Sequence, residues 1–133
     1  MSKPLLLDLK EKSILKTLYE SSEDHTGEIT LSESSENFDY LELELVVNNN
    51  RKTIKINNPH GQTFWEEMGY SLANQYAKVF SLFAINSNKI TPQTANCGYY
   101  TIDYLNNDVI MHLDKNNYIR IVKVVGGNYY EEN

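Results

Sequence analysis

The chain has 133 residues, 41% of them hydrophobic, and a formal net charge of -6. This length and composition fit one compact globular domain and argue against general disorder. Its 12 basic residues are spread out and outnumbered by 18 acidic ones, which argues against nucleic acid as a partner. No apolar run is long enough to span a bilayer, and the N-terminus lacks the pattern of a signal peptide. We therefore expect no membrane partner and synthesis in a cytoplasm.

The N-terminal third is predicted to contribute short strands. The segment "LLLDLKEKSILK" (5–16) fits either an added edge strand or a short helix that packs on a neighbour. The segments "KTLYES" (16–21) and "GEITLS" (27–32) are predicted strands, separated by a polar loop.

A β-hairpin is predicted over residues 40–57. Leu41, Leu43, Leu45 and Val47 alternate with more polar neighbours, which places them on one buried strand face. The "NNN" at 48–50 tolerates the backbone of a tight turn, and "RKTIKIN" resumes the alternation.

The middle of the chain can be read in two ways. Trp65, Met68, Leu72 and Tyr76 lie near helical spacing, but Gly69 interrupts the pattern and "YAKVFSLFAI" also alternates as a strand. We expect a short helix or irregular loop over 64–74, followed by a strand from about 76 to 85.

The last third is predicted to form three strands, "YYTIDYL", "DVIMHLD" and "YIRIVKVV", with Asn-rich turns between them. In the last strand, strict alternation would place Ile119, Ile121 and Val125 on one face and Val122 and Val124 on the other. Short strands at this spacing predict a mainly β fold, an antiparallel, jelly-roll-like β-sandwich of about 7–9 short strands.

Catalytic, metal and cofactor sites are not predicted. His25, His60 and His112 lack the spacing of metal ligands, and no nucleophile elbow or phosphate-binding loop is present. The single cysteine, Cys97, excludes an internal disulfide. We therefore expect no enzyme activity, although a glycosidase-type carboxylate pair depends on the fold and stays an alternative.

Aromatic residues are the candidate binding residues. Rings can stack on sugar faces, so a glycan or protein partner is a hypothesis for part of this set, while core or subunit-interface packing is the alternative. The candidates are Trp65, Tyr99, Tyr100, Tyr104, Tyr129 and Tyr130.

The end of the chain, "NYIRIVKVVGG", resembles the closing strand N-x-I-x-I-x-x-V-V-G of a domain common in virion proteins of tailed bacteriophages. The opening "TLYESSEDHTGEITLSESSENFDYLELEL" is similar to the start of that domain. The matching structural residues are Leu18, Tyr19, Phe38, Tyr40, Asn117, Ile119, Ile121, Val124, Val125 and Gly126.

The resemblance implies a β-rich virion structural protein of a head fibre, head, neck, tail or baseplate. It implies partners that are copies of the same chain, commonly in a trimer, and other virion proteins, with host-surface or glycan binding as an added activity. Residues 17–133 would form the domain and 1–16 an attachment segment. It also suggests that the C-terminal strand pairs inside a sheet, between earlier strands. The alternative is a small acidic phage-encoded inhibitor of a host protein in the cytoplasm.

Overall fold

The computed structural model describes residues 13–72, 75–103 and 105–129. These residues form ten β-strands and two short 3₁₀ helices. In chain order the elements are β1 (Ser13–Glu20), β2 (Ile29–Thr30), η1 (Ser35–Asn37), β3 (Tyr40–Val47), β4 (Asn50–Asn57), β5 (Thr63–Leu72), β6 (Gln75–Asn86), β7 (Lys89–Pro92), η2 (Thr94–Asn96), β8 (Gly98–Asp103), β9 (Asp108–His112) and β10 (Arg120–Tyr129). No helix in this part of the chain could cross a membrane.

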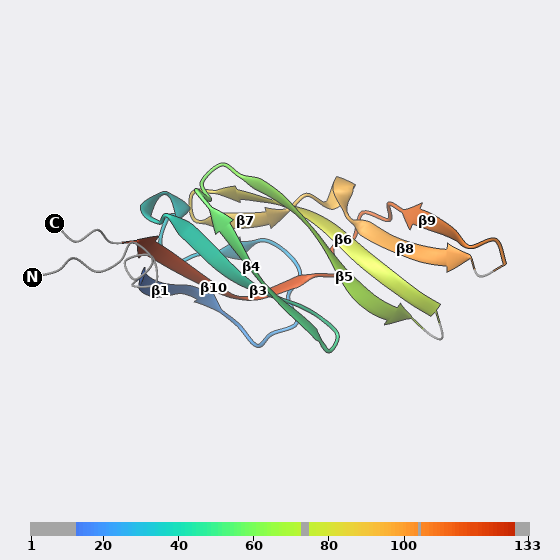
Figure 1. Cartoon of the computed structure of the whole chain (residues 1–133). Coiled ribbons are helices and arrows are strands. Elements are labelled where there is room, and N and C mark those ends of the chain that lie inside the picture. The colour runs from blue at the N-terminus through green and yellow to red at the C-terminus, as the bar shows by residue number, and fades with distance from the viewer. Residues whose placement is uncertain (1–12, 73–74, 104, 130–133) are drawn as a thin grey trace, which may run out of the picture.

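The strands form two antiparallel sheets, which confirms the predicted β-sandwich (Figure 1). The first sheet has the order β1-β10-β3-β4. The second has the order β2-β7-β6-β8-β9, with β5 on the other side of β6. Leu41, Leu43 and Leu45 of the first sheet share one core with Val79 and Phe83 of the second. Ten strands slightly exceed the predicted number, because neither β5 nor β7 was predicted as a strand.

The predicted hairpin over 40–57 is confirmed. β3 and β4 pair in continuous register from Tyr40↔Asn57 to Val47↔Asn50, and Asn48 adopts a positive φ of 52° in the turn. Leu41, Leu43 and Leu45 have no exposed surface, as their alternation predicts.

The predicted helix or loop over 64–74 is wrong for the described residues, because residues 63–72 form β5. β5 pairs along its whole length with β6, in register Thr63↔Ala84 to Leu72↔Gln75. Trp65 is 42% exposed while Met68 is 5% exposed, so the two side chains lie on opposite faces rather than on one helical stripe. The predicted strand at about 76–85 is confirmed as part of β6.

The C-terminal strand β10 lies between β1 and β3, which confirms the interior position suggested for it (Figure 1). Its predicted face assignment is correct for Ile119 and Ile121, which both lie in the core, but wrong beyond Val122. A register shift between Ile121 and Lys123 inserts Val122 as a bulge residue, and this reverses the alternation beyond it. Ile121 and Val124 therefore both face the core.

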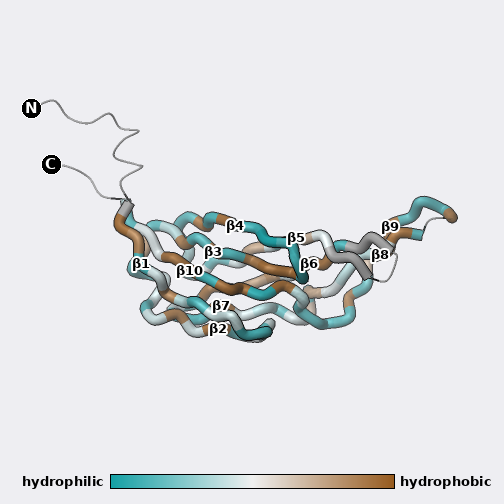
Figure 2. The backbone as a smooth tube through the Cα atoms, turned by 90° about the horizontal axis from the view of Figure 1, so that it is seen from below, coloured by the Kyte–Doolittle hydropathy of each residue, from teal (hydrophilic) through white to brown (hydrophobic). Residues whose placement is uncertain are grey.

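β1 begins at Ser13 and pairs with the end of β10, Ser13↔Tyr129. The sheet therefore starts within the stretch that we expected to be an attachment segment, and residues 1–12 lie outside the described residues. At the opposite end of the molecule, the β8–β9 hairpin projects beyond the sandwich (Figures 1 and 2).

Candidate functional site

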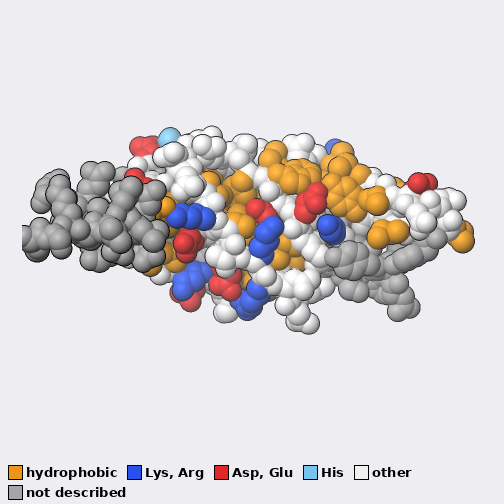
Figure 3. Space-filling view, viewed as in Figure 1, with side chains coloured by type: hydrophobic (Ala, Val, Ile, Leu, Met, Phe, Trp, Pro, Cys, Tyr) orange, Lys and Arg blue, Asp and Glu red, His pale blue; other side chains and the backbone are white. Residues whose placement is uncertain are grey.

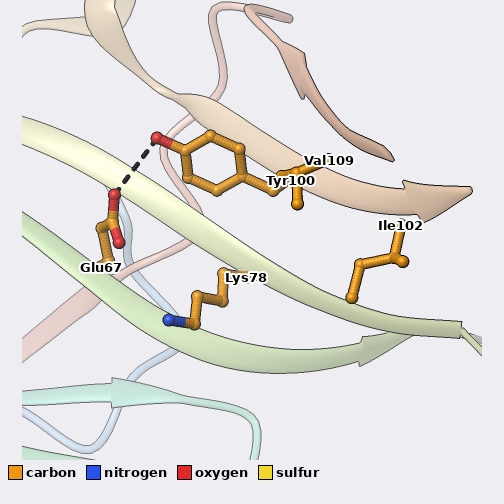
Figure 4. A pocket seen from close by; sticks show the side chains of 5 residues that line it. All are labelled: Glu67, Lys78, Tyr100, Ile102 and Val109. Atoms are coloured by element: carbon orange, nitrogen blue, oxygen red, sulfur yellow. Dashed lines mark hydrogen bonds between the residues drawn. The ribbon is translucent and has the colours of Figure 1, made fainter. Parts of the chain in front are cut away.

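A groove lies on the outer face of β5, β6, β8 and β9, the face turned away from the core. This face continues across the four strands through paired residues, Gly69↔Lys78, Lys78↔Tyr100 and Ile102↔Val109. The groove has a volume of about 250 Å³. It is lined by Glu67, Lys78, Tyr100, Ile102 and Val109 (Figure 4).

Three aromatic rings pack against one another on this outer face. Phe80 has no exposed surface although it points outward, because Trp65 and Tyr100 cover it. The ring centroids lie 5.0 Å apart for Trp65 and Phe80 and 4.8 Å apart for Phe80 and Tyr100. Gly98 makes room for them, since a Cβ there would lie 2.9 Å from Cζ of Phe80.

Glu67 links the two outer rings through one carboxylate oxygen. Trp65 Nε1 donates to Glu67 Oε1 at 3.3 Å. The Tyr100 hydroxyl donates to the same oxygen at 3.2 Å, as Figure 4 shows. Burial, and secondly the hydrogen bond to Glu67, raise the pKa of Tyr100 above its usual value. Tyr100 is therefore a neutral donor at physiological pH.

Hydrophobic side chains gather over β5, β6 and β8 in the space-filling view, whereas acidic and basic side chains alternate over β3 and β4 (Figure 3). The groove can therefore hold an apolar group against Ile102 and Val109, with Lys78 and Glu67 at its polar end.

A serine, a histidine and a glutamate meet elsewhere, near η1. The Ser35 hydroxyl lies 3.5 Å from His60 Nδ1, and His60 Nε2 lies 3.4 Å from Glu36 Oε1. Ser35 is fully buried, and His60 Nδ1 also accepts a hydrogen bond from the Ser87 backbone N–H. The contacts of His60 tie η1 to the β6–β7 turn. Because the Ser35 hydroxyl is buried, a substrate cannot reach it. Among the described residues, no group of three or more His, Cys, Asp or Glu side chains is placed to hold a metal ion.

The structure brings together two of the six aromatic residues proposed from the sequence, Trp65 and Tyr100. Tyr99 points to the opposite face, where its ring stacks on His112 with a centroid distance of 4.6 Å. Tyr129 belongs to the first sheet and lies 5.0 Å from Tyr40, centroid to centroid. Tyr104 and Tyr130 lie outside the described residues.

Sequence reasoning did not identify Glu67, Lys78, Ile102 and Val109 as members of the groove. Glu67 follows a second carboxylate, Glu66, in the sequence. The strand separates the two, because Glu66 bonds Lys52 at 2.6 Å and Glu67 faces the groove. The missing signal was the period of two through β5, which the competing helical pattern obscured.

The residues that carry the family resemblance are structural. Leu18, Tyr40, Ile119, Ile121 and Val124 are at most 5% exposed. Tyr19 and Phe38 pack on the core cluster that contains Leu18, Ile119, Ile121 and Val124, and Val125 and Asn117 are partly buried. Gly126 lies against Phe38, where a Cβ would approach the ring to 2.6 Å.

The described residues form a β-sandwich with a groove on the outer face of its second sheet. Comparisons of the chain with protein-family models, with curated proteins and with solved structures find no match.

Proposed function

We propose that the chain is a non-enzymatic structural protein of a bacteriophage virion, a component of the head, neck, tail or baseplate. It assembles with copies of itself, for which the sequence resemblance implies a trimer, and with other virion proteins. Support comes from the sequence motifs, most of whose residues lie in or against the sandwich core.

The observation that carries the assembly role is the exposed apolar surface of the β8–β9 hairpin. Leu105 is 94% exposed, Val109 66%, Met111 50% and Leu113 56%. Apolar side chains clustered in this way on a projecting hairpin mark an interaction surface, because water contact with them is unfavourable. In a particle built from many subunits, such a surface would be buried in the contacts between them.

The charge distribution favours this role over the alternative, an acidic inhibitor that mimics nucleic acid. Several acidic side chains are paired with cations on the surface, as in Arg51–Glu44 at 2.5 Å and Lys16–Glu33 at 2.6 Å. A mimic of a phosphate backbone needs a continuous negative surface, and these cations interrupt it.

The test is a cryo-electron-microscopy map of the particle, together with mass spectrometry of purified virions and of infected-cell lysate. We expect the chain in the particle at a copy number set by its symmetry. Its presence in lysate and absence from purified particles would support the inhibitor instead.

Glycan binding is a second candidate activity, favoured by the 42% exposed Trp65 beside Glu67. A sugar face can stack on the indole, and the carboxylate can accept from a hydroxyl. Because Trp65 is the only tryptophan, titration of its fluorescence with host-surface oligosaccharides tests this directly. A saturable change that Tyr129→Ala retains supports binding at Trp65, whereas no change up to millimolar sugar opposes it.

A further inference from the structure

β9 is an edge strand with apolar exposed residues at its centre. Among the described strands it pairs with β8 alone, so its second edge of backbone N–H and C=O groups faces outward. Its three central residues, Val109, Ile110 and Met111, are 66%, 43% and 50% exposed. Edge strands are usually protected from pairing by charges, prolines or bulges. The centre of β9 has no such protection.

We propose that β9 pairs antiparallel with β9 of a second copy of this chain, across a two-fold axis at Ile110. The inference rests on the proposed self-assembly and names one of its contacts. A two-fold axis perpendicular to the sheet pairs residues that lie on the same face. Centred on Ile110, it sets Val109 opposite Met111 of the second copy, and Ile110 opposite Ile110.

Hydrogen-bonding complementarity selects this register. Asp108 would lie opposite His112 of the second copy, and the reverse pair would form at the other end of the strand. Within one copy Asp108 lies directly across from Asp103, a like-charge pair that is unfavourable on its own. An imidazole on the other side of Asp108 offsets that repulsion. A shift of two residues in either direction would instead place Asp108 or His112 opposite Ile110.

His112 is held in position for this contact. Its Nε2 lies 2.8 Å from Thr101 Oγ1, and its ring stacks on Tyr99. These contacts fix the ring on the same strand face as Ile110 and Asp108, two and four residues away along the period of two.

The pairing also extends the groove. Val109 lines the groove, and Met111 lies on the same face, opposite Tyr100 in the register. Across the axis, Val109 of one copy meets Met111 of the other, so the two grooves join into one apolar surface. A ladder of five residues has few backbone hydrogen bonds. Burial of these apolar side chains adds a hydrophobic contribution that stabilises the pairing.

The test uses opposite charges at the symmetry axis, where each Ile110 faces its own copy. We expect the wild-type chain to have the mass of an even number of copies by light scattering, namely two, or six if the contact links two trimers. Ile110→Lys alone and Ile110→Glu alone should each break this contact and halve the mass. An equimolar mixture of the two variants should restore it, since Lys then faces Glu.

Ile14→Lys is the matched control, because Ile14 is also an exposed isoleucine, at 63%, on the edge strand β1 of the other sheet. It should leave the mass unchanged. A wild-type mass of one copy would overturn both this inference and the proposed self-assembly. An oligomer that survives both Ile110 substitutions, or is lost with Ile14→Lys and kept with Ile110→Lys, would overturn the β9 pairing and leave self-assembly standing.

Discussion

Gly127 of β10 lies directly under the ring of Tyr40 of β3, its partner in the ladder. A Cβ at Gly127 would lie 2.1 Å from Cζ of that ring. Tyr40 is 3% exposed and contacts the Tyr129 ring, and Lys55 Nζ lies 4.1 Å from its centroid. The absence of a side chain at Gly127 therefore lets an aromatic ring cover the outer face of the first sheet.

Gly127→Ala is expected to lower the free energy of unfolding by about 3 kcal/mol, because the ring or the backbone must move. Denaturant unfolding measures the change. Gly27→Ala is the control: its nearest neighbour is the exposed His25 side chain, 3.2 Å away, which can shift aside. We expect a change within about 0.5 kcal/mol there, and equal losses for the two variants would contradict this account.

Asn117→Ala is expected to cost about 3 kcal/mol, because one amide satisfies several partly buried groups. Its Oδ1 accepts from the Ser81 hydroxyl at 2.5 Å, and its Nδ2 donates to the Thr26 carbonyl at 2.7 Å. The neighbouring Asn116→Ala removes an exposed side-chain hydrogen bond, from Nδ2 to Asp114 Oδ2 at 3.4 Å, and keeps the one donated by its backbone N–H, so it should cost less than about 0.5 kcal/mol. Thermal or denaturant unfolding of the pair separates the two roles.

The bulge at Val122 makes a prediction of its own. Val124→Ala removes buried methyl groups from a side chain with no exposed surface and should cost about 2 kcal/mol. Val122→Ala, at the partly buried bulge position, should cost less than about 1 kcal/mol. The reverse order of stabilities would mean that β10 keeps strict alternation.

Stability should fall in alkaline solution in a way that depends on Tyr118. Burial, and secondly its hydrogen bond to Asp114, raise the pKa of Tyr118 from 10.0 to about 12. The folded state therefore favours the neutral phenol, and this contribution is complete below pH 10 and lost as the pH rises through 12. Unfolding free energies at pH 9 and above 11 should diverge less for Tyr118→Phe than for the wild type. An identical pH dependence of the two proteins would refute the assignment.

Cys97 should report on opening of the fold. The thiol is fully buried, and Sγ donates to the Gln93 carbonyl oxygen at 3.3 Å. A thiol reagent in excess should label the native protein slowly and the protein in denaturant at once, because the reagent reaches the buried sulfur only when the fold opens. Rapid labelling of the native protein at neutral pH would show that the η2 region opens without global unfolding.

Local pattern predicted the elements whose two faces differ strongly. Leu41, Leu43 and Leu45 alternate with polar residues, so β3 was predictable without knowledge of its neighbours. The β5 segment was not, because Trp65 and Met68 satisfy a helical spacing as well as a strand. Pairing with residues 75–84 decides between the two, and that pairing is a non-local interaction.

The site was predictable only in part for the same reason. Trp65 and Tyr100 could be named as surface aromatic residues, but their meeting depends on Phe80 lying between them in β6. The bulge at Val122 leaves no clear mark in the sequence, because valines lie on both faces of the strand from residue 122 to 125. Register, rather than composition, places Glu67 and Val109 on the same face.

The central place of β10 has a consequence for how the polypeptide matures. As the nascent chain emerges, the β3–β4 hairpin can form early, but β3 and β1 are neighbours of β10 and not of each other. Until residues 120–129 leave the ribosome, the backbone edge of β3 that pairs with β10 stays unpaired, next to the leucine-rich face of the strand. Pairing of β10 with β1 and β3 is late and long-range, so it is expected to be slow. A prematurely terminated chain would leave the edge of β3 unpaired, and such an edge promotes aggregation.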